Sequence, residues 1–184
     1  MALDPRAYRD TIGLFATGVA VIAAHVGSEV HAMTANAVSS LSLEPLRLLF
    51  CPGKKARFAQ FLAPGLAFSV NFLRADQQAL STFFAGGWKQ PEPPPFRFVP
   101  LGEAPRLEGS LASIGCVAEQ LIDGGDHWIV IGGVRAVKLG VGPQQPLLFF
   151  RGRYHAIDFA AGAQARDLAA VSDEPAHVYY DAGR

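Results

Sequence analysis

Short apolar runs that are rich in β-branched and aromatic residues recur along this chain of 184 residues, and glycine, proline and polar turns separate them. Such runs predict β-strands, and hairpin turns at short intervals favour antiparallel pairing. A closed or partly closed barrel removes the exposed edges of such a sheet. We therefore predict a mainly β fold with a few helices. The predicted strands cover residues 19–25, 30–35, 46–51, 66–72, 107–120 with a break near Gly109, 128–139, 146–150 and 154–159.

One short helix is predicted at the start of the chain. Asp4 can cap it and Pro5 suits its first position. Tyr8, Ile12 and Phe15 then form a single apolar stripe.

Two further segments, residues 57–62 and 76–84, also have helical spacing, with Asp76 near the start of the second. Residues 86–105 are rich in proline and predict an irregular excursion, which at this length is usually a functional flap or a surface wrap. We expect one domain over residues 1–160. The tail at 161–184 is rich in alanine and charge and fits either a loose helix or a partly ordered arm.

The overall composition excludes several classes of protein. Half of the residues are apolar, which is typical of a globular domain with a sizeable core. The formal net charge is zero, and the only local basic cluster is Lys54, Lys55 and Arg57. A protein that neutralises nucleic-acid phosphates normally has a broad basic face, so we expect no nucleic-acid partner. Three cations suit one phosphate-bearing ligand better.

Cysteine and histidine usage points to neither disulfides nor a metal. Cys51 and Cys116 both lie in apolar, strand-like sequence and are expected to be buried free thiols without a redox role. His25 and His31 flank a turn, but no nearby third ligand completes a metal site, so no metal is expected. The sequence has no glycine-rich nucleotide-binding motif of the doubly wound type and no P-loop.

The first residues mix acidic and basic groups and lack the layout of a signal peptide. No uninterrupted apolar run approaches the roughly 18 residues of a membrane span. We expect a soluble, cytoplasmic protein with no membrane partner.

The most informative segment, residues 30–51, joins two strand-like runs through small and hydroxyl-bearing residues. Its polar side chains can supply hydrogen bonds, and Ala35 and Ala37 leave room for a planar ring to approach the main chain. The pattern indicates a backbone site for a polar cofactor, although a plain polar turn between strands would have the same residues. The hydrogen-bonding candidates are Thr34, Asn36, Ser39, Ser40 and Ser42.

Two later segments also carry chemistry. Asp126 and His127 follow a Gly-Gly turn and precede an apolar run, which places a titratable imidazole at the start of a strand. Near the end of the predicted sheet, Arg151, Arg153 and Tyr154 bring basic and aromatic groups together at a glycine turn.

These segments, in this order, resemble the flavin reductase-like family of FMN-binding split barrels, the short-chain flavin reductase components of two-component monooxygenases. The resemblance extends over residues 8–158 and includes FATGVAVIAAH at 15–25, CPGKKARF at 51–58, FSVNFLRADQQALSTFFAG at 68–86 and GGDHWIVIG at 124–132. It implies a Greek-key antiparallel split β-barrel of the FMN-binding type. It also implies a homodimer with each flavin near the subunit interface.

The resemblance assigns candidate cofactor contacts. The family's loop that lines the isoalloxazine ring matches Met33, Thr34, Ala35, Asn36, Ser39 and Ser40. Many relatives place Ser and Thr where this chain has Ala56 and Phe58, so the hydroxyls that anchor the flavin phosphate are missing. Lys54, Lys55 and Arg57 can replace them. A solvated basic turn is the alternative.

His127 is the candidate catalytic residue, because the matching His of the family lies beside the nicotinamide. Arg151 and Tyr154 match the family's final strand, near flavin and nicotinamide, but also fit an ordinary hairpin. Phe84 is a candidate cofactor contact, although Phe83 and Phe84 equally suit a core.

The implied reaction is hydride transfer from NADH, or with less support NADPH, to FMN or FAD, with reduced flavin passing to a separate flavin-dependent oxygenase. The cofactors carry this chemistry, so no catalytic dyad is needed. A flavin-binding module for electron transfer or storage, without turnover of free flavin, is the main alternative. A small barrel that carries an apolar ligand and an oxidase of a phosphorylated pyridine, such as pyridoxamine phosphate, are others.

Overall fold

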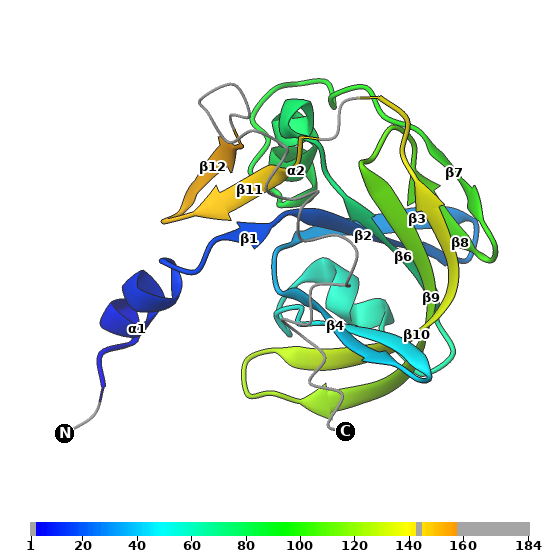
Figure 1. The fold of residues 1–184 in the computed structure, drawn as a ribbon, viewed down its shortest axis with the longest axis horizontal. Helices are drawn as coiled ribbons and strands as arrows, with labels where there is room; N and C mark the ends of the chain where they lie inside the picture. Colours follow the sequence, from blue (N-terminus) through cyan, green and yellow to red (C-terminus); the bar gives the residue numbers. More distant parts are fainter. Residues whose placement is uncertain (1–2, 143–144, 158–184) are drawn as a thin grey trace, which may run out of the picture.

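Seven antiparallel strands form the main sheet of the computed structural model, which describes residues 3–142 and 145–157. Their order across the sheet is β3-β2-β6-β9-β10-β5-β4 (Figure 1). A second sheet has the order β1-β11-β12, and β7 pairs with β8. The strands are β1 (Thr17–Gly18), β2 (Ala20–Val26), β3 (Glu29–Ala35), β4 (Val38–Leu43), β5 (Leu46–Phe50), β6 (Ala67–Phe72), β7 (Phe98–Leu101), β8 (Ala104–Leu107), β9 (Ala112–Asp123), β10 (Trp128–Leu139), β11 (Leu147–Phe150) and β12 (Arg153–Ala156).

Four helical segments join these strands: α1 (Pro5–Ile12), the 3-10 turns η1 (Arg57–Phe61) and η2 (Ala75–Gln77), and α2 (Gln78–Phe84). The prediction of a mainly β, antiparallel architecture is confirmed. The predicted tail at 161–184 and the end of the predicted domain at residue 160 lie outside the described residues.

Strand β2 runs through the middle of the fold, and its apolar run is continuous because both of its faces are buried. Ala20, Ile22 and Ala24 face the larger hydrophobic cluster, whereas Val19 and Val21 belong to a second cluster. A strand that is buried on both faces cannot alternate apolar and polar residues. Burial in two cores therefore explains why the apolar residues of this strand follow one another without polar residues between them.

The second cluster fills the space between β2, α2, β8 and β11. A buried polar network crosses beside it. The Asn71 amide donates to the carbonyl of Val21 at 2.9 Å, and its Oδ1 accepts from the Leu107 amide at 2.9 Å and from the Ser113 hydroxyl at 2.8 Å. Because each polar atom of this buried side chain has a partner, the network links β2, β6, β8 and β9 without an unpaired group.

Two predictions of local structure are wrong. The excursion at 86–105 is not irregular to its end, because β7 and β8 form a hairpin with Gly102 at φ +60°. The stretch between the predicted strands 30–35 and 46–51, expected to be a loop closed by Pro45, contains β4, whose serines pair with β5. In both cases the long-range pairing of the strand outweighs a local composition that favours turns.

The other local predictions agree closely with the structure. Helix α1 begins as expected, with the Asp4 carboxylate accepting a hydrogen bond from the Arg6 amide at 2.9 Å. The helix predicted at 76–84 is present as η2 followed by α2, and the predicted break near Gly109 separates β8 from β9. However, α1 has no buried residue, and Figure 1 shows it projecting away from the sheets.

Candidate functional site

Strands β3 and β4 are consecutive in sequence, yet they form opposite edges of the seven-stranded sheet. The chain passes from one edge to the other through Asn36 and Ala37 alone. No described strand pairs with the outer side of either edge, so backbone N–H and C=O groups on those sides have no partner strand. This is the segment that the sequence marked as a backbone site.

A cavity of about 590 Å³ lies beside this junction. Residues 36–39 form one wall, and Leu49 and Cys51 from the end of β5 extend it. The other walls come from α1 with the turn after it and from the β11–β12 turn. A smaller cavity of about 230 Å³ shares Phe15, Thr17, Asn36 and Val38 with it. The volume and the mixture of apolar walls with a few polar groups are typical of a small-molecule site.

The side chains of the predicted ring-binding loop divide into two groups. Met33 packs against the larger core, Ala35 is buried, and the Thr34 hydroxyl donates to the carbonyl of Ser81 at 2.7 Å. These side chains are directed mainly at the protein, so the backbone is the main contact that this stretch offers a ligand. Asn36 and Ser39, in contrast, are exposed and line the cavity.

Hydrogen bonds fix the orientation of these polar groups. The Asn36 amide donates to the Thr17 hydroxyl at 3.2 Å, which ties the junction to β1. The Ser39 hydroxyl donates to the carbonyl of Ser40 at 3.0 Å. The Tyr154 hydroxyl lies 2.9 Å from that of Ser81, which is fully buried, so Tyr154 supports α2 and β3 from β12.

The predicted phosphate anchors also differ from one another. Lys54 Nζ lies 2.7 Å from Asp123 Oδ2 and 4.5 Å from the centroid of the Trp128 ring. Lys55 and Arg57 are exposed and form no hydrogen bond or ion pair with any residue that the structure describes. Lys54 is therefore already neutralised by the protein, whereas Lys55 and Arg57 are the cations that remain for an anionic ligand.

His127 lies on the turn between β9 and β10, directly against the basic turn. Its Nδ1 is 2.8 Å from Asp126 Oδ1, and its backbone bridges to Gly53. The Lys54 amide donates to the Asp126 carbonyl at 2.9 Å. The hydrogen bond from His127, together with its charge, holds the pKa of Asp126 below its ordinary value. About half of the His127 side chain is exposed, at 49%.

A Cβ added at Gly53 would lie 3.6 Å from His127 Nε2, an ordinary contact distance, so the imidazole packs directly against this turn.

The β11–β12 turn closes the cavity from a third side. Arg151 has a φ of +50°, and its amide donates to the Gly13 carbonyl at 2.9 Å. The turn therefore fixes the end of α1. Phe149 and Gly152 line the cavity, and the Phe149 ring meets Tyr154 edge-on with centroids 5.5 Å apart.

The predicted site residues thus lie around more than one space. Asn36 and Ser39 share the cavity at the β3–β4 junction, whereas Arg57 and Phe84 line a separate pocket beside β3. Sequence reasoning missed the contribution of α1, the turn after it and Cys51. The apolar stripe of α1 was a usable signal, because Ile12 and Phe15 line the cavity instead of entering a core.

Cys51 also differs from the expectation of a buried thiol. It is half-buried in the cavity wall, and burial raises its pKa. Cys116 is buried as expected, and burial raises its pKa to about 12, which leaves the thiol protonated and unreactive.

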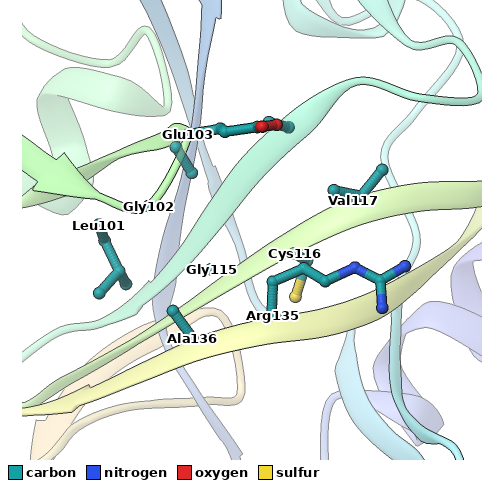
Figure 2. Close-up of a pocket in the computed structure, with 10 residues that line it drawn as sticks. Leu101, Gly102, Glu103, Gly115, Cys116, Val117, Arg135 and Ala136 are labelled. Atoms are coloured by element: carbon teal, nitrogen blue, oxygen red, sulfur yellow. The ribbon is translucent and has the colours of Figure 1, made fainter.

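Another hollow, of about 280 Å³, lies on the face of β9 and β10. Figure 2 shows Leu101 and Glu103 from the β7–β8 turn on one side of it and Arg135 and Ala136 on the other. It shares no residue with the cavity at the β3–β4 junction. Within residues 3–142 and 145–157, no group of three or more His, Cys, Asp or Glu is arranged to hold a metal ion. No helix in that part of the chain is long and apolar enough to span a membrane.

Comparison with known proteins gives a consistent result. The family model described as the flavin reductase like domain matches residues 12–158. The reductase subunit of a flavin-dependent monooxygenase from Rhodococcus jostii is 36% identical over 162 residues, which cover 85% of this chain and 80% of that protein.

Two solved structures are similarly close. A flavin reductase in its native state superposes with a TM-score of 0.78 at 39% identity, covering 85% of this chain and 99% of that one. The NADH:FAD oxidoreductase of Streptomyces globisporus, solved in complex with NAD and FAD fragments, has a TM-score of 0.74 at 32% identity and covers 88% of this chain and 99% of that one.

Proposed function

The chain belongs to the flavin reductase-like domain family, which makes it an oxidoreductase that acts on flavins, and we propose that it transfers hydride from NADH to FMN or FAD. The observation that carries the proposal is that the family match spans both edges of the split sheet and nearly all residues of the cavity beside their junction. A bound flavin supplies the electron chemistry. The protein's residues hold the two reactants in place and keep water away.

The flavin ring is proposed to lie along the β3–β4 junction. Because the side chains of Met33, Thr34 and Ala35 face the protein, their backbone groups are the ones that hydrogen-bond the polar edge of the ring. Asn36 and Ser39 add side-chain contacts from the cavity wall. Lys55 and Arg57, which have no described partner, are proposed to anchor the flavin phosphate.

His127 is proposed to hold the nicotinamide. When Nδ1 donates to the Asp126 carboxylate, Nε2 of the neutral ring is an acceptor. A carboxamide N–H₂ is a suitable donor to it. Asp126 then acts by fixing the orientation of the ring, and the backbone bridge to Gly53 places that ring beside the phosphate turn.

We propose that the chain forms a homodimer through α1 and the β4–β5 hairpin. Both present large apolar side chains to solvent in the single chain, and exposed apolar patches of this kind mark interaction surfaces. The exposed residues on α1 and its following turn are Tyr8, Ile12, Leu14 and Phe15, and those on the hairpin are Leu41, Leu43 and Leu46. Because Ile12 and Phe15 also line the cavity, a second chain at α1 would border the flavin site.

Reduced flavin is proposed to pass to a separate oxygenase, since the Rhodococcus jostii relative is a reductase subunit of a flavin-dependent monooxygenase. A cytoplasmic location is also proposed. Both cysteines of the chain are free thiols, and free thiols suit a reducing compartment.

The deciding experiment is NADH oxidation by the purified protein, followed by the loss of NADH absorbance, without flavin and then with FMN or FAD. We expect turnover that depends on added flavin, with NADPH as a slower donor. Bound flavin without oxidation of either nicotinamide would replace the proposal with an electron-transfer or storage module.

A further inference from the structure

A pocket of about 460 Å³ lies between β3, η1, α2 and the segment that follows α2. Five phenylalanines line it, and four of them form a connected cluster: Phe83, Phe84, Phe96 and Phe98. Their rings contact one another at tilted or edge-on angles, with centroids between 5.0 and 6.0 Å apart. Phe96 remains 39% exposed, so the cluster is not a closed core and keeps aromatic surface for a planar ligand.

One cation without a partner lines this aromatic pocket. Arg57 is exposed and forms no ion pair with any residue that the structure describes. The nearby His31 differs, because its ring stacks on Phe61 at 4.3 Å and its Nε2 lies 3.5 Å from Glu29. An aromatic pocket with one available guanidinium is complementary to a ring that carries a phosphate.

The aromatic pocket and the proposed flavin site both involve β3. Val30, His31 and Ala32 of β3 line it, and Thr34 lies on the same strand. Three residues along a strand span roughly 10 Å. The extended sugar and diphosphate chain of a dinucleotide can cover such a distance along the unpaired edge of β3.

We propose that this pocket binds the adenosine monophosphate end of FAD, so that the protein takes FAD in preference to FMN. The proposal rests on the proposed function, because it requires the flavin ring at the β3–β4 junction. The purine packs against the phenylalanine rings, and Arg57 faces the diphosphate. FMN lacks the adenosine end and leaves the pocket unused.

NADH carries the same adenosine monophosphate group, but two observations favour FAD. Arg57 belongs to the turn proposed to anchor the flavin phosphate, and β3 is the strand proposed to carry the flavin ring. His127, the proposed nicotinamide contact, does not line this pocket.

The test is equilibrium binding of FAD and FMN to the full chain, with AMP as a competitor. We expect the wild type to bind FAD about tenfold more tightly than FMN, as one stacked base typically contributes. AMP should raise the apparent Kd for FAD more than that for FMN, because it competes with FAD for the aromatic pocket and with FMN only for Arg57. This measurement needs no variant, so it holds even if a substitution unfolds the protein.

The variant Phe96→Ala should lose about tenfold in FAD affinity and keep its FMN affinity. The matched control is Leu139→Ala, which truncates an exposed apolar side chain on β10 and should change neither the FAD affinity nor the FMN affinity. Equal affinity of the wild type for the two flavins, or an equal loss of both in Phe96→Ala, would overturn the proposal. So would a rise in the KM for NADH with unchanged FAD binding. If the wild type oxidises NADH but does not prefer FAD, only this inference is rejected. If it binds FAD selectively but does not oxidise NADH, only the proposed reaction is rejected.

Discussion

Lys54 Nζ lies 2.7 Å from a carboxylate oxygen of Asp123, which fastens the basic turn before η1 to the turn between β9 and β10. The Lys54 amide reaches the same turn through the Asp126 carbonyl. The proposed phosphate anchor and the proposed nicotinamide contact are therefore parts of one connected unit. A change on either side of it should be measurable in stability as well as in binding.

Asp123→Asn should lower Tm at neutral pH by a small amount, on the order of a degree or two. The hydrogen bond from Lys54, and then that from the Gly125 amide, hold the pKa of Asp123 below its ordinary 3.8. The carboxylate therefore stabilises the fold fully above pH 3.8, and this contribution is lost as the pH falls through the lower folded-state pKa. Thermal melts of wild type and variant across this range should converge in acid. Glu103→Gln, at the exposed β7–β8 turn, is the control, and a difference between wild type and Asp123→Asn that persists in acid would contradict the assignment.

Replacing Lys55 and Arg57 together by Ala should weaken binding of both flavins by roughly tenfold or more, because a charge-assisted contact to phosphate is lost. The salt dependence of binding should also become shallower. Titration of FMN and FAD at several ionic strengths measures both effects. Arg106→Ala with Lys138→Ala removes the same charge from positions that line neither the cavity at the β3–β4 junction nor the aromatic pocket, and should leave binding intact. If the two double variants have the same flavin affinity and salt dependence, Lys55 and Arg57 are solvated surface residues and do not anchor the phosphate.

His127→Ala should raise the KM for NADH about tenfold, as expected for one lost hydrogen bond to a polar group. The affinity for flavin should change little, since flavin contacts come from other segments. Steady-state kinetics with the nicotinamide varied at saturating flavin give the KM. His25→Ala, at an exposed position on β2, is the matched control. An unchanged KM in His127→Ala would exclude the proposed contact.

Gly132→Ala should destabilise the fold by about 1–3 kcal/mol, because overpacking of a filled core forces its neighbours to move. A Cβ at this position would lie 2.6 Å from the Phe68 ring and 3.2 Å from the Cys116 Cβ. Gly18→Ala is the comparison, since a Cβ there meets nothing within 4 Å. Denaturant unfolding of both variants measures the difference, and equal free energies of unfolding would contradict this account of the packing.

Local signals predicted most of the strands because these signals are properties of short segments. The run at β2, the cap at Asp4 and the break near Gly109 needed no knowledge of the rest of the chain. β4 and the β7–β8 hairpin were missed because their stability comes from pairing with β5 and with each other, against turn-like composition. Such pairing is not visible in a local window.

The candidate site divides in the same way. Asn36 and Ser39 could be selected by residue type and position, and both line the cavity. The neutralisation of Lys54 by Asp123 could not be predicted, because those residues lie far apart in the sequence. The gathering of Phe96 with Phe83 also depends on how the segment after α2 folds back over that helix.

The passage from β3 to β4 through Asn36 and Ala37 has a mechanical consequence. The two free edges of the sheet are joined there by a covalent tether of two residues, not by a ladder of hydrogen bonds. The tether therefore limits how far the end of β3 and the start of β4 can separate, to roughly 10 Å for the three steps from Ala35 to Val38. An insertion between Asn36 and Ala37 would relax this limit without removing a strand pairing.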